Sequence, residues 1–298
     1  MNNMKKIALL LSAALIALTA CDPMEEIVNE PITTKFVEKI TNAVDGSVIS
    51  LSYDSDMRVT GVTKTNPTDS SQDRHYEVKY NLDMTTNTVT FDIISGEDKF
   101  VMEFNEYGAL KEFVRDGATR EVLSTFVYNN YTSVSAFHLE LKGMVDNLTG
   151  GEAKRIDWSY GTPVNQINQI DRVIENEKYT YSTSIQYEYL AYCSNVRANV
   201  NFFNLLTPEF LEYSNIPTEL AATVSVFGSR SSYLPTDVTL TKGRSEAGEN
   251  YVKLTEETRE FSYELDERGY ISKIFTGKEE SKNKKLLYTI EYANVKQK

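Results

Sequence analysis

The sequence predicts a mainly β fold, an antiparallel meander of hairpins that forms a large curved sheet, an open barrel or a sandwich. Its composition is the first observation, because 19 Tyr and 13 Phe stand against one Trp and seven Pro, and aromatic residues suit pleated, half-buried strands. The second observation is hydrophobicity with a period of two, which is typical of antiparallel strands with one buried and one wet face. The third is a series of turn signals between the alternating runs.

Four runs carry the alternation. In each of them one set of alternate positions is mostly apolar or aromatic, and the positions between are mostly polar. The first sets are Tyr76, Val78, Tyr80 and Leu82; Tyr179, Tyr181, Thr183, Ile185, Tyr187 and Tyr189; Phe261, Tyr263 and Leu265; and Leu286, Tyr288, Ile290 and Tyr292. We therefore expect these four runs to be strands of one antiparallel fold.

Glycine-containing dipeptides of the kind that forms hairpin turns separate the strands. They are Asp45-Gly46, Ser95-Gly96, Asp116-Gly117, Gly150-Gly151 and Arg268-Gly269. Aromatic residues recur at Tyr53, Tyr80, Phe104 and Tyr128, about one hairpin length apart. This recurrence predicts a meander of similar hairpins.

A single segment interrupts the strand pattern. In NFFNLLTPEFLEYSNIP, Thr207 is suited to cap a helix and Pro208 to occupy its first turn, and Pro217 lies beyond it. The sequence therefore predicts one short helix near residues 208–213.

The first twenty residues have the order of a secretory signal peptide. Lys5 and Lys6 precede an apolar run over 7–17, and the small residues Thr19 and Ala20 follow it. The apolar run is shorter than the roughly 20 residues that a membrane-spanning helix needs. We expect residues 1–20 to be removed.

Leu18-Thr19-Ala20-Cys21 resembles the bacterial lipobox, a leucine and two small residues before a cysteine. The resemblance implies that the sulfur of Cys21 is acylated with fatty acids such as palmitate and that Cys21 becomes the mature N-terminus. Stable anchoring takes two or more acyl chains, and a lipoprotein terminus carries that many. The membrane is therefore the first expected partner. The alternative is an ordinary cleaved signal with a chance cysteine.

Three regions follow from these patterns. Residues 1–20 are the lipoprotein signal peptide, and residues 21–35 are an acidic tether without periodicity. Residues 36–298 are expected to form a single antiparallel β domain. The alternative is two β halves divided near residues 145–152.

Charge and cysteine content exclude further partners. The chain has a formal net charge of -12, and losing Lys5 and Lys6 with the signal makes it more negative, so nucleic acid is a poor partner. The only other cysteine, Cys193, is left without a disulfide partner once Cys21 is acylated. We interpret Cys193 as a small buried residue, with a nucleophile as the alternative.

Motifs for catalysis or metal binding are missing from the sequence. The two histidines, His75 and His138, belong to no zinc pattern, and no Gly-x-Ser-x-Gly elbow or phosphate loop occurs. Asp54 and Asp56 begin like a calcium loop, but Arg58 stands where the third ligand belongs, so they read as turn residues. We expect no cofactor, no metal and no catalytic residue, and hence a protein that is not an enzyme.

Trp158 and Tyr160 are the candidate ligand-binding residues. Aromatic faces stack on sugar rings, so these residues would form a glycan platform. Because Ile156 shares their strand face, the alternative is a buried core strip. Two further functions stay open, namely a glycan-acting hydrolase that uses two carboxylates and a structural or assembly component of an envelope complex.

Three segments look alike, LSYDSDMRVTGV from Leu51, MEFNEYGALKEF from Met102 and FSYELDERGYISKI from Phe261. They resemble the Tyr-Asp hairpins of Bacteroidota envelope lipoproteins that belong to domain families of unknown function. The resemblance implies an antiparallel β fold and an envelope location, and it implies no activity. Met57 stands where these hairpins usually have glycine, so we expect a longer or differently shaped turn there.

The acidic residues that follow Cys21 indicate where the protein is located. Asp22, Glu25 and Glu26 resemble the acidic signal that exports Bacteroidota lipoproteins to the cell surface. We therefore expect an outer-membrane lipoprotein exposed at the cell surface, with a periplasm-facing protein as the alternative. Its partners would then be the membrane and a glycan or another envelope protein.

Overall fold

The fold is known from a computed structural model of the chain. The structure describes residues 35–83, 88–105, 110–133, 136–146, 154–161, 166–175, 179–194, 200, 202–206, 215–223, 233–246, 249–278 and 280–294. These residues form sixteen strands, two short α-helices and one 3-10 turn, so the prediction of a mainly β, antiparallel fold is confirmed.

The first eight strands follow one another with short connections. They are β1 (Lys35–Asn42), β2 (Val48–Tyr53), β3 (Val59–Thr65), β4 (Arg74–Asp83), β5 (Thr88–Ser95), β6 (Asp98–Phe104), β7 (Leu110–Asp116) and β8 (Arg120–Ser133), with the 3-10 turn η1 (Ser70–Gln72) before β4. The other eight are β9 (Ala136–Asp146), β10 (Lys154–Gly161), β11 (Gln166–Glu175), β12 (Tyr179–Ser194), β13 (Tyr233–Glu246), β14 (Val252–Leu265), β15 (Ile271–Thr276) and β16 (Lys285–Asn294).

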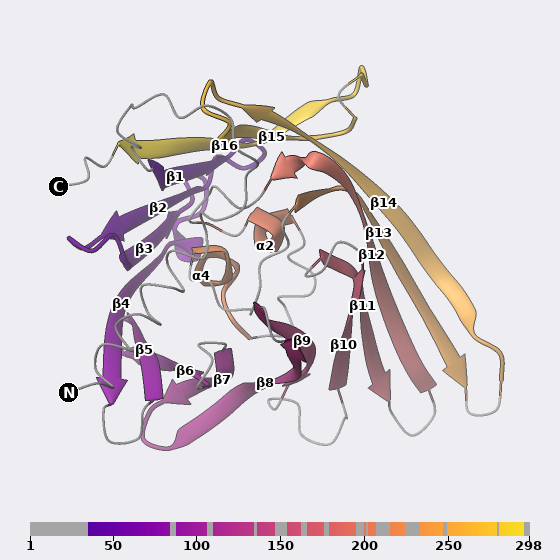
Figure 1. The fold of residues 1–298 in the computed structure, drawn as a ribbon, viewed down its shortest axis with the longest axis horizontal. Helices are drawn as coiled ribbons and strands as arrows, with labels where there is room; N and C mark the ends of the chain where they lie inside the picture. Colours follow the sequence, from indigo (N-terminus) through magenta and orange to yellow (C-terminus); the bar gives the residue numbers. More distant parts are fainter. Residues whose placement is uncertain are drawn as a thin grey trace.

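Each strand pairs antiparallel with the strands before and after it in the chain. β1 pairs with β2 on one side and with β16 on the other, where Ile40 lies opposite Ile290. The ladder of strand pairs therefore returns to its start, and the curved sheet that the sequence predicts is a closed barrel (Figure 1).

Alternation within β4 to β8 gives this part of the barrel an apolar inside. One row of paired residues across β4 to β8 shows this directly, because its members are apolar or aromatic except the last: Tyr80, Phe91, Met102, Phe113 and Ser124. Aromatic rings meet along this wall, with centroids 4.5 Å apart for Tyr80 and Phe91 and 4.4 Å apart for Phe91 and Phe104. Such contacts add to the free energy gained by burying the rings.

The predicted turns lie between strands wherever the structure describes them. Ser95 pairs with Asp98 across a two-residue loop whose first residue, Gly96, has a φ of 60°, a conformation that favours glycine. Gly46 and Gly269 also have positive φ, at 72° and 80°. The Gly150-Gly151 turn lies outside the described residues.

Register shifts explain where the predicted alternation departs from the structure. Leu286 is 36% exposed, although the sequence places it in phase with the buried Ile290. Ile274 pairs with Tyr288 and Phe275 with Leu286, so Leu287 is the extra residue of a bulge, and Leu287 packs against the core instead. A bulge inserts one residue and so exchanges the faces beyond it.

The turns of two resembling segments have the same hydrogen bonds. In the first, Asp54 Oδ1 accepts from the backbone N–H of Asp56 and of Arg58. In the second, Asp266 Oδ1 accepts from Arg268 and Tyr270 in the same way. In both turns the backbone N–H of the aspartate also donates to the carbonyl of the residue four positions later.

Met57 takes the position of Gly269 in this shared turn. Its φ is 62°, close to the left-handed value of the glycine. The expectation that the turn around Met57 is longer or differently shaped is therefore wrong, because methionine adopts the glycine conformation and the Asp54 side chain still holds the loop.

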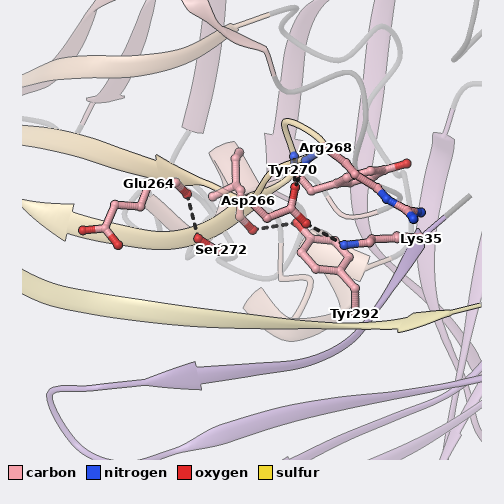
Figure 2. A network of polar contacts seen from close by, with 8 residues as sticks. Lys35, Glu264, Asp266, Arg268, Tyr270, Ser272 and Tyr292 are labelled. Carbon is pink, nitrogen blue, oxygen red and sulfur yellow. Dashed lines mark hydrogen bonds and ion pairs between the residues drawn. The ribbon is translucent and has the colours of Figure 1, made fainter. Parts of the chain in front are cut away.

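The second turn is tied to the start of the barrel (Figure 2). Lys35 Nζ, at the beginning of β1, lies 2.6 Å from Asp266 Oδ2. Tyr292 on the intervening β16 donates to the carbonyl of Ile271, and its ring lies 5.3 Å from that of Tyr270. Burial opposes ionisation of Asp266, but the Lys35 ammonium and the backbone N–H donors outweigh it and hold the pKa of that carboxyl below its usual value.

Two helices lie inside the ring of strands (Figure 1), α2 (Phe202–Leu206) and α4 (Thr218–Thr223). The helix predicted near residues 208–213 falls outside the described residues, between these two. Across the described parts of the chain, none of the helices has the length and apolar character needed to cross a membrane.

Gly269 should be less tolerant of a side chain than a glycine with ordinary backbone angles. We expect Gly269→Ala to lower the free energy of unfolding by about 1–2 kcal/mol, because its φ of 80° is strained for an L-residue. Gly117→Ala is the control, since its nearest neighbour atom would lie 4.0 Å from the added Cβ. Urea unfolding measures the stability of both variants. Equal losses of stability would contradict the assignment of a left-handed conformation to Gly269.

Asp266 should stabilise the fold in a pH-dependent way. Its folded pKa lies below the unfolded value of about 3.9, so its contribution is present above that pH and is lost as pH falls through the folded pKa. We expect Asp266→Asn to cost about 1–2 kcal/mol at pH 7, and this cost to shrink as the pH is lowered from 7 through the folded pKa.

Urea unfolding midpoints of the parent and the variant across this range give the measurement. Asp56→Asn is the matched control, because this carboxylate is 69% exposed and its loss should change stability by less than about 0.5 kcal/mol. A difference for Asp266→Asn that stays constant with pH would show that the charge is not responsible.

Candidate functional site

The outer face of strands β4 to β8 is polar and charged. The row of residues next to the inner aromatic row, and pointing the opposite way, contains Asn81, Thr90, Glu103, Glu112 and Thr125. His75, Glu77 and Lys79 on β4 are exposed on the same side, as the sequence predicts for the wet face of that strand. The outside of these strands is therefore suited to water.

Ion pairs connect the strands across this outer face. Lys99 Nζ lies 2.8 Å from Asp116 and 3.4 Å from Asp92, so one ammonium bridges β5, β6 and β7. Arg120 binds both Glu103 and Glu112, at 2.6 and 3.0 Å. Each exposed ion pair contributes only about 0–1 kcal/mol to stability. These pairs matter here because they show that the outward positions of these strands are charged.

The two helices fill one end of the barrel interior. Phe202, Leu205 and Leu206 of α2 and Leu220 of α4 are buried among the inward side chains of the strands. Asn204 donates through Nδ2 to the carbonyl of Ala221 at 2.6 Å and so joins the two helices. This end of the barrel is a packed core.

A buried polar contact holds α4 to the wall. The hydroxyl of Tyr76 on β4 donates to Glu219 Oε1 at 3.0 Å, and the two residues are only 4% and 5% exposed. Burial, then the nearby Glu219 charge, raises the pKa of Tyr76, so its proton stays in place at neutral pH. Asn215, in the segment before α4, similarly donates to Ser124 Oγ and to the carbonyl of Leu123 on β8.

The inner wall changes character along β12, β13 and β14. On β13, Val238 and Leu240 are buried, whereas the next two inward residues, Lys242 and Arg244, are exposed. On β14, Phe261 is buried and Glu257 is exposed. The apolar core therefore gives way to a polar inner wall that is open to solvent.

We call this surface the polar wall and take it as the candidate functional site. Register places its strands side by side, with Tyr181 opposite Arg244 and Thr183 opposite Lys242. The guanidinium carbon of Arg244 lies 5.0 Å from the ring centroid of Tyr179. The described members of the polar wall are Tyr179, Tyr181, Thr183, Lys242, Arg244, Glu246, Thr255, Glu257 and Arg259.

One ion pair on the polar wall is already formed. Arg259 Nε lies 2.8 Å from Glu257 Oε1, and this hydrogen bond holds the pKa of Glu257 below its usual value. Hydroxyl, phenol and cationic groups therefore converge on one concave side of the sheet, which is suited to binding a polar ligand rather than to burying an apolar one.

Trp158 and Tyr160 lie on β10, as the predicted strand requires. Trp158 pairs with Ile170, Ile170 with Ile185, and Ile185 with Leu240, so this row is the one next to the polar wall. The side chains of β10 fall outside the described residues, and the choice between glycan platform and core strip stays a prediction.

Other residues singled out in the sequence are placed as follows. His75 Nδ1 lies 2.9 Å from Thr63 Oγ1 on the outer face. Asp54 and Asp56 are turn residues, as predicted. Cys21 lies outside the described residues, and Cys193 and His138 lie on strands whose side chains are not described there.

Metal-binding groups are not assembled in the described part of the chain, where no three His, Cys, Asp or Glu side chains come together. The sequence did not single out Lys242 or Arg244. The available signal was a strand, residues 238–244, whose alternation continues while its inward positions change from apolar to cationic.

Comparisons with known proteins bear on the fold. No known family and no curated protein matches the sequence. Among solved structures, a porin-like protein from Bacteroides uniformis is similar with a TM-score of 0.52 at 15% identity, covering 88% of this chain and 98% of that one. A porin-like protein from Bacteroides vulgatus matches with a TM-score of 0.49 at 13% identity, covering 87% and 100%. The chain thus shares the fold of the first of these proteins.

Proposed function

We propose that this chain is a lipid-anchored protein of the outer membrane whose barrel stands in water beside the membrane, at the cell surface, and binds a ligand without catalysing a reaction. The polarity of the barrel carries this proposal. Outward positions of β6, β7 and β8 hold charged residues joined by ion pairs, and inward positions of the same strands belong to the apolar core.

A barrel within lipid has the opposite arrangement, with an apolar outer band about 25 Å tall and a polar interior. A Lys or Arg that faces lipid at the bilayer midplane costs about 2–4 kcal/mol. Lys99 and Arg120 lie on the outer face beside several carboxylates, so inserting these strands would be strongly unfavourable.

The anchor would then come from Cys21 rather than from the strands. The lipobox-like Leu18-Thr19-Ala20-Cys21 supports it, and the acidic residues behind Cys21 support export to the surface. The polar wall is the part of the barrel best suited to a ligand, because Lys242, Arg244 and Glu257 are inward-facing and yet exposed.

Cys21→Ala should abolish incorporation of a labelled fatty acid and shift the protein away from the membrane fraction. The physical reason is the loss of the acyl chains, each buried CH₂ of which contributes about 0.8 kcal/mol. Metabolic labelling with an alkyne fatty acid and fractionation measure both effects. Cys193→Ala is the matched control and should stay labelled, whereas labelling that persists in Cys21→Ala would refute the anchor.

The barrel should fold in buffer without detergent. Residues 22–298 produced without a signal are expected to show a β-rich circular dichroism spectrum and cooperative unfolding, because the outward side chains are hydrated in the folded state. In planar bilayers the same protein should give no ion conductance. Folding that requires detergent, or steady conductance, would contradict the proposal.

A further inference from the structure

The polar wall has a composition that specifies the class of ligand. We infer that it binds a saccharide chain that carries carboxylate groups, and this inference rests on the proposed function. Its central residues are Tyr179, Tyr181, Thr183, Lys242 and Arg244, which come from the paired strands β12 and β13.

Geometry brings rings and cations to the same face. Neighbouring strands lie about 4.8 Å apart and alternate residues point to the same side, so Tyr181, Arg244, Thr183 and Lys242 form a two-by-two array. Arg244 already lies over the ring of Tyr179, at 5.0 Å.

Charge distinguishes the two faces of these strands. The chain as a whole carries a formal charge of -12, and the outer face here bears Glu188, Asp237 and Glu260. On the inner face Lys242 and Arg244 are exposed, while Glu257 is engaged by Arg259. Glu246 lies beyond them at the end of β13. An anion would therefore be attracted to the centre of the polar wall.

The aromatic residues and the openness of the wall select the kind of anion. Tyrosine rings offer flat apolar faces with a polar rim, which suit sugar rings, and an arginine fork pairs with a carboxylate through two hydrogen bonds. A compact ligand is usually buried over 70–90% of its surface, which an exposed wall does not provide. An extended chain would lie along it.

Binding of fluorescein-labelled oligogalacturonate to the full-length protein in phosphatidylcholine vesicles tests the inference, with fluorescein-labelled dextran as the neutral saccharide. We expect oligogalacturonate to bind, to bind at least about tenfold more tightly than dextran, and to weaken as salt rises from 50 to 500 mM. The double variant Lys242→Gln with Arg244→Gln should weaken binding at least about tenfold. Lys253→Gln is the matched control, because Lys253 pairs with Gly243 and with Glu256 on the outer face of the same hairpin.

The outcomes separate the ligand class from the proposed function. Equal binding of dextran and oligogalacturonate, unchanged in the double variant, would overturn the inference that the ligand is anionic. The proposal of a lipid-anchored binding protein would still stand. An equal loss in Lys253→Gln would overturn the placement on the polar wall. No binding of oligogalacturonate by the folded parent would overturn the inference. If the double variant loses its β-rich spectrum, a second double variant, Tyr181→Phe with Arg244→Lys, takes its place. The salt dependence of binding by the parent is then read beside it.

Discussion

Closure of the sheet is the constraint on which the rest of the structure depends. Because β1 pairs with β16, the ladder of strand pairs leaves the barrel without a first or last strand. Each strand then has one face inside and one outside, and the period-two alternation of the sequence becomes a difference between the interior and the surface. The ion pair between Lys35 and Asp266 joins the start of the first strand to a turn near the end of the chain, at this same junction.

Closure also makes the interior a limited space that must be filled. Side chains alone fill small barrels, while larger ones enclose a cavity or a channel. In this barrel α2 and α4 add buried apolar side chains to the interior, and Tyr76 with Glu219 gives α4 a polar attachment to the wall. A lipid-facing barrel has its apolar residues outside. Shifting the alternation by one residue would produce that arrangement, because it would exchange core and surface.

The polar wall arises where the long strands β12, β13 and β14 extend past the packed helices. Strand β14 pairs with β15 only over Phe261–Leu265, because β15 is six residues long. Beyond that point the inward residues described on β12, β13 and β14 are Tyr, Thr, Lys, Arg and Glu. Side chains on strands are held in place more precisely than side chains on loops, and this favours the polar wall as the functional site.

Local sequence by itself determined the strands, the turns at Gly46, Gly96 and Gly269, and the wet face that carries His75, because alternation and turn chemistry act between near neighbours. Register decided the rest. The bulge at Leu287 exposes Leu286, the hydrogen bonds of Asp54 allow Met57 to replace a glycine, and pairing between β12 and β13 brings Tyr181 to Arg244. These depend on which residues lie opposite one another across strands, which sequence spacing leaves open and which only the closed sheet specifies.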